Sequence, residues 1–283
     1  MTNQECIKLF ETYLKDEKNA SKNTLESYMR DIRQLSEFLE ESCGKSLAAA
    51  KSSQLEDYIE RLRASGKSVA TVSRAIASIK SFYMQLCIKQ VIKNSPATSL
   101  SPEKSESKIP EIMSHEEVDR FLRQPKCIDA KGYRDHAMLE LLYATGMRVS
   151  ELLDMNLEDV NLDRMLVRCG ESRPRVVPIH SAAVSALREY IDYVRPQMVA
   201  SEEENALFVN VQGERMSRQG FWKLIKLYAK KAKIDKDITP HTLRHSFAAH
   251  MIENGADVHS VQELLGHVDL SSTKLYRNVI AQA

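Results

Sequence analysis

Apolar residues recur at helical spacing in four segments of the first third of the chain. The clearest case is "SKNTLESYMRDIRQLSEFLEE", residues 21–41, where one face carries Leu25, Tyr28, Met29, Ile32, Leu35, Phe38 and Leu39. This repeat is typical of an amphipathic helix. The pattern predicts helices over roughly 3–18, 21–41, 52–64 and 68–86. Asn23 and Glu26 are expected to form a capping box at the start of the second helix.

A polar segment separates these four helices from the rest of the chain. "NSPATSLSPEKSESKIP", residues 94–110, contains three prolines and five serines, a composition typical of a linker. We therefore expect a first domain over 1–95, a linker over 96–110 and a second domain over 111–283.

The second domain is predicted to be mostly helical with a small antiparallel sheet. Its first helix follows Ser114, with Glu117 three residues later as in a capping box. Strand-like segments occur at 164–169, 175–180 and 206–210. The short turn "GESRP" joins the first two into a predicted β-hairpin. Phe221 and Trp222 are expected in the core of a later helix. The predicted fold class is mainly α, with a four-helix N-terminal domain.

Composition narrows the class of protein. No apolar run approaches the roughly 18 residues that span a bilayer, so no membrane partner is expected. The five cysteines are widely spaced and never form C-x-x-C. This usage disfavours a disulfide framework or a zinc site and predicts a reducing, cytoplasmic location.

The net charge of +1 does not indicate whether the chain binds nucleic acid, but the distribution of the charged residues does. Residues 61–93 contain no acidic residue and seven basic ones: Arg61, Arg63, Lys67, Arg74, Lys80, Lys89 and Lys93. This stretch is either an ordinary solvated face or a surface that contacts phosphates, and the clustering favours the second interpretation.

A polar cluster near the C-terminal end indicates chemistry. In "TPHTLRHSFAAHM", His241, Arg244 and His245 are spaced to lie near one face of a helix that starts near Pro240. Two histidines at this spacing can bind zinc, but a third ligand at a usual spacing is missing. An anion site fits better, because Arg and His donate hydrogen bonds to phosphoryl oxygens. A tyrosine on a nearby helix is then a candidate nucleophile.

Four motifs in this order resemble one family. "ATGMRVSEL", "RPRVVPIH", "HTLRHSFAAHM" and "LLGHVDLSSTKLY" are closely similar to motifs of the tyrosine recombinases, and in size and layout the chain looks like the Xer-type members. The resemblance covers nearly the whole chain. It implies an N-terminal core-binding domain and a C-terminal catalytic domain that clamp double-stranded DNA and exchange its strands.

The resemblance also implies roles for individual residues. Arg148 and Arg244 would bind the non-bridging oxygens of the scissile phosphate, and His241 would assist proton transfer. His267 would donate to the phosphate or orient it. Tyr276 would attack the phosphorus, forming a 3′-phosphotyrosyl bond and releasing a 5′-hydroxyl without ATP, metal or other cofactor.

Two further residues follow from the same match. Glu151 would orient the active-site groups. Arg173 occupies the place where relatives usually carry a hairpin lysine that protonates the departing oxygen. Arginine holds its proton more tightly than lysine, so we expect slower cleavage. His245 and His250 are expected to pack or to form local hydrogen bonds.

The first domain is expected to contact the DNA backbone, and several copies of the chain are expected to assemble on the DNA. The expected contacts to the DNA backbone are Lys22, Asn23, Arg30, Arg74 and Lys80. The resemblance implies a homo-oligomer on DNA, a tetrameric synapse, with a second recombinase or an accessory protein as an open alternative. A catalytically impaired DNA-binding member and a type IB topoisomerase-like enzyme also stay open. So does the choice between chromosome dimer resolution and mobile-element movement.

Overall fold

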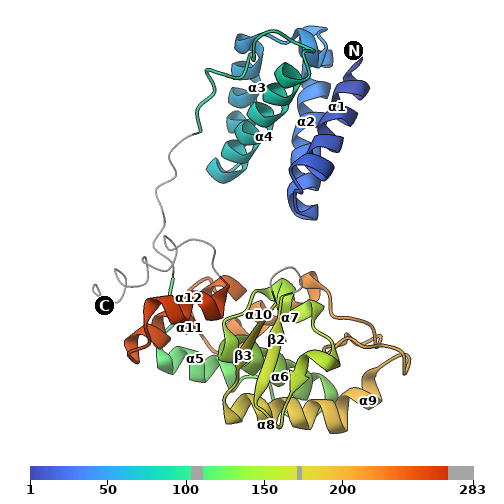
Figure 1. Cartoon of the computed structure of the whole chain (residues 1–283). Helices are drawn as coiled ribbons and strands as arrows, with labels where there is room; N and C mark the ends of the chain where they lie inside the picture. Colours follow the sequence, from blue (N-terminus) through green and yellow to red (C-terminus); the bar gives the residue numbers. More distant parts are fainter. Residues whose placement is uncertain (103–110, 171–173, 267–283) are drawn as a thin grey trace. The chain divides into compact units, whose positions relative to one another are not determined.

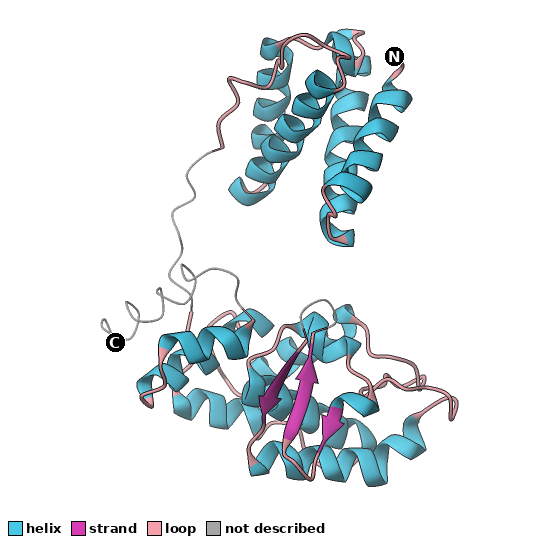
Figure 2. Ribbon diagram, viewed as in Figure 1, coloured by secondary structure: helices cyan, strands magenta, loops and turns pink. Residues whose placement is uncertain are grey.

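The computed structural model describes residues 1–102, 111–170 and 174–266. Contacts divide the chain into two units, residues 1–107 and 108–283, and each is described by itself. Helices dominate both units, and three short antiparallel strands form the sheet (Figure 2). The predicted mainly α fold class is therefore confirmed. Within the described ranges, no helix is long and apolar enough to cross a bilayer.

The first unit contains the four helices that the apolar pattern predicted (Figure 1). They are α1 (Asn3–Thr12, continued by a π-helical turn over Tyr13–Glu17), α2 (Lys22–Cys43), α3 (Ser52–Ala64) and α4 (Val69–Ile88). Their apolar faces meet in one core that includes Phe10, Ile32, Leu35, Ile59 and Phe82. Burial of these faces stabilises helices that would be marginal alone.

The predicted cap of α2 was wrong. Ser21 is the N-cap, and its hydroxyl accepts a hydrogen bond from the Thr24 N–H at 3.2 Å. Asn23 lies exposed in the first turn instead. Both residue types are good caps, but Ser21 has the extended backbone that an N-cap requires. The helix therefore begins two residues earlier than a cap at Asn23 would allow.

A buried carboxylate joins α2 to α4. Asp31 is 3% exposed and accepts hydrogen bonds from Arg74 Nη1 at 2.6 Å and Ser78 Oγ at 3.1 Å. Burial raises the pKa of Asp31, against the opposing effect of the Arg74 charge. Removing one partner of such a buried pair is strongly destabilising. Arg74, selected from the sequence as a DNA contact, therefore also holds the first unit together.

The second unit places a small sheet beside a group of helices. Its helices are α5 (His115–Leu122), α6 (Ala130–Thr145), α7 (Val149–Asp154), α8 (Ser181–Glu189), α9 (Arg195–Met198), α10 (Arg218–Lys231), α11 (Pro240–Glu253) and α12 (Val258–Leu265). A 3-10 turn spans Leu157–Asp159, and a π-helical turn over Tyr190–Val194 follows α8. The capping box predicted at Ser114 and Glu117 is present.

The sheet has the strand order β1 (Val160–Asn161), β2 (Leu166–Cys169) and β3 (Arg175–Pro178). The predicted hairpin is confirmed, because β2 and β3 pair antiparallel from Leu166 opposite Pro178 to Cys169 opposite Arg175.

The strand predicted at 206–210 was wrong. Ala206 and Val209 form only isolated bridges, to Asn156 and Arg215. Other groups take the backbone of this segment: the Ala206 carbonyl accepts from the buried Arg195 guanidinium, and the Phe208 carbonyl accepts from the Met216 N–H. A short apolar run signals burial, and periodicity alone does not assign it to a ladder.

The two residues of α10 that were predicted to lie in the core differ in exposure. Phe221 is fully buried, whereas Trp222 is 49% exposed and packs its ring against the Lys226 ammonium group at 4.6 Å. Placing Trp222 in the core was therefore wrong.

The helix α11 is buried on nearly all sides, so its polar side chains need internal partners. Ser246 Oγ accepts the Met113 N–H at 2.9 Å, and His250 Nε2 donates to the Met113 carbonyl at 3.0 Å. Because a carbonyl only accepts, the other ring nitrogen of His250 is the acceptor for the Tyr143 hydroxyl at 2.7 Å. The hydrogen bonding expected of His250 is confirmed, and it ties α11 to the backbone just before α5.

The helix α6 ends at a glycine that the packing requires. Gly146 has φ +56, and a Cβ there would lie 2.3 Å from Phe247 Cδ1 and 2.8 Å from Leu265 Cδ2. Only glycine satisfies both the left-handed backbone and the lack of space.

Gly146→Ala is therefore expected to lower the free energy of unfolding of the second unit by about 2 to 4 kcal/mol, the sum of positive-φ strain and overpacking. Gly255→Ala is the matched control, because Gly255 has φ +87 but a Cβ added there would contact no other group within 4 Å. It should cost only the strain, about 1 to 2 kcal/mol. Urea unfolding followed by circular dichroism measures both, and equal losses would contradict the steric argument.

Candidate active site

Arg148 lies at the N-terminal end of α7. It is the N-cap residue, and its backbone N–H donates to Glu151 Oε2 at 2.7 Å. Its side chain remains 43% exposed, donating from Nη1 to Glu151 Oε1 at 3.3 Å and from Nη2 to the Gly266 carbonyl at 3.2 Å. The capping box thus fixes the backbone of Arg148 and leaves its guanidinium accessible.

Arg244 comes from α11, which begins at Pro240 as predicted. The residue is 4% exposed. Its Nη1 donates to the Gly146 carbonyl at 2.6 Å, and its Nη2 donates to the Leu265 carbonyl at 2.7 Å. These two bonds hold the end of α6 and the end of α12 to one buried charge.

The structure brings the two predicted arginines together at the end of α12. Arg244 binds the carbonyl of Leu265 and Arg148 binds the carbonyl of Gly266. The last carbonyls of a helix lack intrahelical partners and carry the negative end of its dipole. Two guanidinium groups therefore bind successive carbonyls immediately before His267 in the chain.

Glu151 links Arg148 to a second arginine from the hairpin. Arg175 on β3 donates from Nη1 and Nη2 to the two oxygens of Glu151, at 2.8 and 2.9 Å. Burial opposes ionisation of Glu151, but the hydrogen bonds from Arg175 and Arg148 outweigh it and lower the pKa of this carboxyl. Glu151 is thus a charged group held between two arginines.

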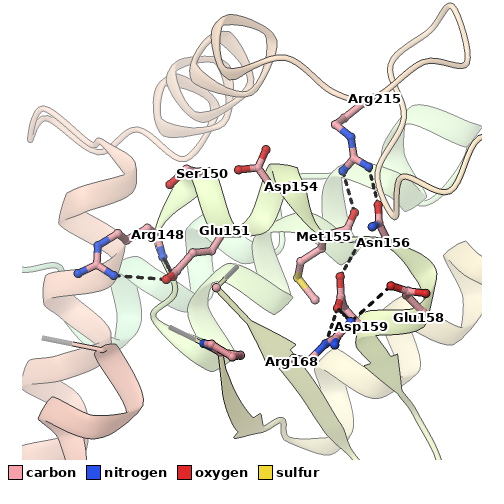
Figure 3. Close-up of a pocket in the computed structure, with 12 residues that line it drawn as sticks. Arg148, Ser150, Glu151, Asp154, Met155, Asn156, Glu158, Asp159, Arg168 and Arg215 are labelled. Carbon is pink, nitrogen blue, oxygen red and sulfur yellow. Dashed lines mark hydrogen bonds and ion pairs between the residues drawn. The ribbon is translucent and has the colours of Figure 1, made fainter. Parts of the chain in front are cut away.

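An open cavity of about 760 Å³ lies beside this group (Figure 3). Arg148 and Glu151 line one part of it, and Gly170 and Pro174 at the ends of the hairpin turn line another. Figure 3 shows the Arg148 side chain bonded to Glu151 at the edge of this space. The cavity gives a ligand access to the accessible arginine.

His241 and His245 lie one turn apart on α11. Their ring centroids are 6.4 Å apart, and His241 is exposed at the first turn of the helix. Burial, together with the nearby charges of His241 and Arg244, lowers the pKa of His245 to about 4. His245 is therefore neutral at pH 7, and the exposed His241 is the imidazole that a ligand can reach.

Three predicted site residues, Arg173, His267 and Tyr276, lie outside the described residues. Two of them follow or precede a described element in the chain. β3 starts two residues after Arg173, and α12 with its cap Gly266 directly precedes His267.

The group in the described ranges that is closest to a metal site is His115, His250 and Glu253, whose ligand atoms lie within 4.8 Å of one another. Both ring nitrogens of His250 are already bonded, one to Met113 and one to Tyr143. The group therefore lacks the free lone pair on His250 that a metal requires.

Arg175, which binds Glu151 in the structure, was not selected from the sequence. Its motif "RPRVVPIH" was noted, but its role was not. Alternation in β3 places Arg175 on the same side as the buried Val177. A charged residue on the inward face of a strand predicts a buried partner, and that signal was available.

Comparisons with known proteins identify the family of the chain. Residues 111–282 match the Phage integrase family, and residues 7–90 match the N-terminal SAM-like domain of phage integrases. The tyrosine recombinase XerD of Oceanobacillus iheyensis is 43% identical over 279 residues, covering 97% of this chain and 93% of that protein. The XerD of Staphylococcus epidermidis is 40% identical over 275 residues, covering 96% and 93%.

Solved structures share the fold. A XerH site-specific recombinase bound to a palindromic difH substrate, in a post-cleavage complex, has a TM-score of 0.77 at 21% identity, covering 96% of this chain and 81% of that one. A lambda integrase dimer bound to a COC′ core site has a TM-score of 0.73 at 17% identity, covering 96% and 97%. The chain therefore belongs to the phage integrase family and is a tyrosine site-specific recombinase.

The low pKa of His245 predicts acid sensitivity of the fold. Its folded pKa of about 4 lies below the ordinary value of 6.5, so the unfolded chain binds the proton first. The resulting stability is complete above about pH 6.5 and is lost as the pH falls towards 4, by on the order of 2 to 3 kcal/mol.

His245→Gln should therefore flatten the fall of the melting temperature between pH 7 and pH 5. The exposed His259 provides the control His259→Gln, which should leave the profile of the parent in place. A pH profile unchanged in His245→Gln would show that this imidazole does not titrate on unfolding.

Proposed function

We propose that this chain cleaves and rejoins double-stranded DNA at a specific site through a 3′-phosphotyrosyl intermediate, without metal, ATP or other cofactor. The observation that carries the proposal is the convergence of Arg148 and Arg244 at the end of α12, directly before His267. Two guanidinium groups at one point are suited to a phosphoryl group, whose transition state gains negative charge.

The described residues support a division of labour. Arg148, which is accessible beside the cavity, binds a non-bridging oxygen of the scissile phosphate. Arg244 binds the same phosphate from the buried side. His241, at the exposed start of α11, bonds the phosphate and assists proton transfer. The Glu151 carboxylate is kept from the phosphate, because Arg175 binds both of its oxygens.

The remaining steps are proposed for residues known from the sequence alone. Tyr276 attacks the phosphorus, the bond to the 5′-oxygen breaks, and the enzyme holds the 3′-phosphate. His267 donates to a phosphate oxygen or orients it. Arg173 donates a hydrogen bond to the departing 5′-oxygen, which takes a proton from water to become the 5′-hydroxyl. Because the covalent link conserves the phosphodiester bond energy, the reverse attack by another 5′-hydroxyl rejoins the strand without ATP.

The proposed partner is duplex DNA bound by several copies of the chain. Structural relatives are recombinases bound to their DNA sites, and two relatives at 40% and 43% identity are XerD proteins. We propose a tetrameric synapse in the cytoplasm that acts on chromosomal DNA, with chromosome partition favoured over mobile-element movement. The cysteines in the described ranges are free, which is consistent with that location.

Tyr276→Phe tests the nucleophile. The variant should bind DNA within about twofold of the parent, because the phenol contributes little to the many phosphate contacts, and should form no covalent adduct on a nicked suicide substrate. Denaturing gels detect the adduct. Relaxation of a plasmid lacking the target site would instead support a topoisomerase-like enzyme, and an adduct surviving in Tyr276→Phe would identify another nucleophile.

A 5′-bridging phosphorothiolate in the same assay addresses Arg173, because its sulfur leaves without a proton. Arg173→Ala should slow adduct formation on normal DNA more than on the phosphorothiolate. Equal slowing on both substrates would exclude contact with the departing oxygen.

The DNA-backbone contacts are proposed for the exposed side chains of α2 and α4. Lys22, Asn23 and Arg30 lie exposed on α2. Lys80 is exposed on α4 and donates to the Leu100 carbonyl at 3.0 Å. Arg74 is the exception, because its guanidinium donates to the Asp31 carboxylate and to the Ser27 carbonyl within the fold. A test of DNA contact should therefore leave Arg74 in place.

The double variant Lys22→Ala/Arg30→Ala should weaken binding to all sequences and reduce the slope of log K against log salt by about 1.8, since two fewer counterions are released. Lys15→Ala on the π-helical turn after α1 is the control, because its ammonium pairs with Glu11. Fluorescence anisotropy at several salt concentrations measures the slope. A slope equal to that of the parent would mean that this face contacts solvent only.

A further inference from the structure

Arg175 is a half-buried arginine whose donors are all directed at protein groups. Its side chain is 14% exposed. Both terminal nitrogens donate to Glu151, and Nε donates to the Leu264 carbonyl at 2.6 Å. The planar fork of arginine matches a carboxylate in this bidentate way, which lysine cannot reproduce.

This residue completes a set of three arginines on one helix end. The carbonyls of Leu264, Leu265 and Gly266 accept, in order, from Arg175, Arg244 and Arg148. A Cβ at Gly266 would lie 3.2 Å from Arg175 Nη1, so the glycine lets the guanidinium approach the chain closely. The backbone that leads into His267 is therefore fixed by three cations.

Arg175 also determines how much of the Arg148 charge is available. Glu151 contacts both arginines, but its contact with Arg175 is bidentate at 2.8 and 2.9 Å, whereas Arg148 Nη1 is 3.3 Å away. The tighter pair neutralises the carboxylate. Without Arg175, the Glu151 charge has Arg148 as its nearest described cation, and Arg148 would be drawn away from a phosphate.

We propose that Arg175 is a positioning residue for DNA cleavage, which keeps Glu151 neutralised so that the Arg148 guanidinium is free to bind the scissile phosphate. Arg175 itself does not touch the phosphate, because its donors are directed at Glu151 and Leu264. This inference rests on the proposed function, in which Arg148 stabilises the phosphoryl transition state.

The test is the single-turnover rate of covalent adduct formation on a nicked suicide substrate. Arg175→Gln should slow it about 100-fold, the order of loss expected when one transition-state donor is withdrawn. DNA affinity should stay within about twofold of the parent, because only one of many phosphate contacts changes. Arg175→Lys keeps the charge and loses the fork, so its loss should be smaller, about tenfold.

Two double variants separate positioning from general structural damage. Adding Glu151→Gln to Arg175→Gln removes the unpaired carboxylate and should recover at least about tenfold in rate. In an Arg148→Ala background, Arg175→Gln should cost less than about threefold, because the two residues act as a unit.

The control is Arg195→Gln. Arg195 is another buried arginine, 6% exposed, which donates to the carbonyls of Glu204 and Ala206. Arg195→Gln should lower the melting temperature as Arg175→Gln does, yet leave the cleavage rate of folded protein within about twofold of the parent. Its effect on the rate should be the same with and without Arg148→Ala.

The possible outcomes are distinct. Equal cost of Arg175→Gln with and without Arg148, or no recovery by Glu151→Gln, would overturn the positioning role. If Arg175→Gln fails to fold, the same comparison made with Arg175→Lys decides. No adduct from the parent protein would refute the proposed function itself, independently of Arg175.

Discussion

Two helix C-termini meet at one point in the second unit, and the Arg244 guanidinium lies between them. The end of α6 presents the Gly146 carbonyl, and the end of α12 presents the Leu265 carbonyl. Each is the negative end of a helix dipole, so the two ends would repel without a cation. A buried arginine with terminal nitrogens directed at both ends turns this repulsion into attraction. The fold therefore requires a positive charge at the position where the proposed chemistry also requires one.

This constraint explains how several cations gather in one place before any substrate is bound. Backbone carbonyls carry partial charges, whereas a phosphodiester carries a full one, so a phosphate is a stronger partner for the same donors. In the proposed reaction, the carbonyls of α12 would hold the guanidinium groups in place until the phosphate binds them. Groups that are already in place do not have to be reorganised during the reaction, which is the main source of electrostatic catalysis.

Much of the fold could be predicted from the sequence because local patterns encode it. The helices of the first unit and the β2–β3 hairpin follow from periodicity. The prediction that Trp222 lies in the core failed for a geometric reason. Trp222 follows the buried Phe221 by one residue, so it is rotated about 100° around the helix axis and faces outward. The strand predicted at 206–210 failed because its apolar residues are buried by loops and by Arg195, not by neighbouring strands.

The candidate site was predictable where one motif contains the residue and its neighbours. His241 and Arg244 share one helix, and Arg148 and Glu151 share one capping box. Arg175 was missed because its carboxylate partner lies 24 residues away and its carbonyl partner 89 residues away. Such pairs are set by tertiary packing, which periodicity and spacing do not report.

The attachment of Met113 to α11 has a mechanical consequence. Both backbone groups of Met113 are bound by side chains of this one helix, Ser246 and His250. The same helix carries His241 and Arg244 at its other end. Tension in the chain that enters the second unit is thus borne by the helix that carries these catalytic candidates, and not by a surface loop.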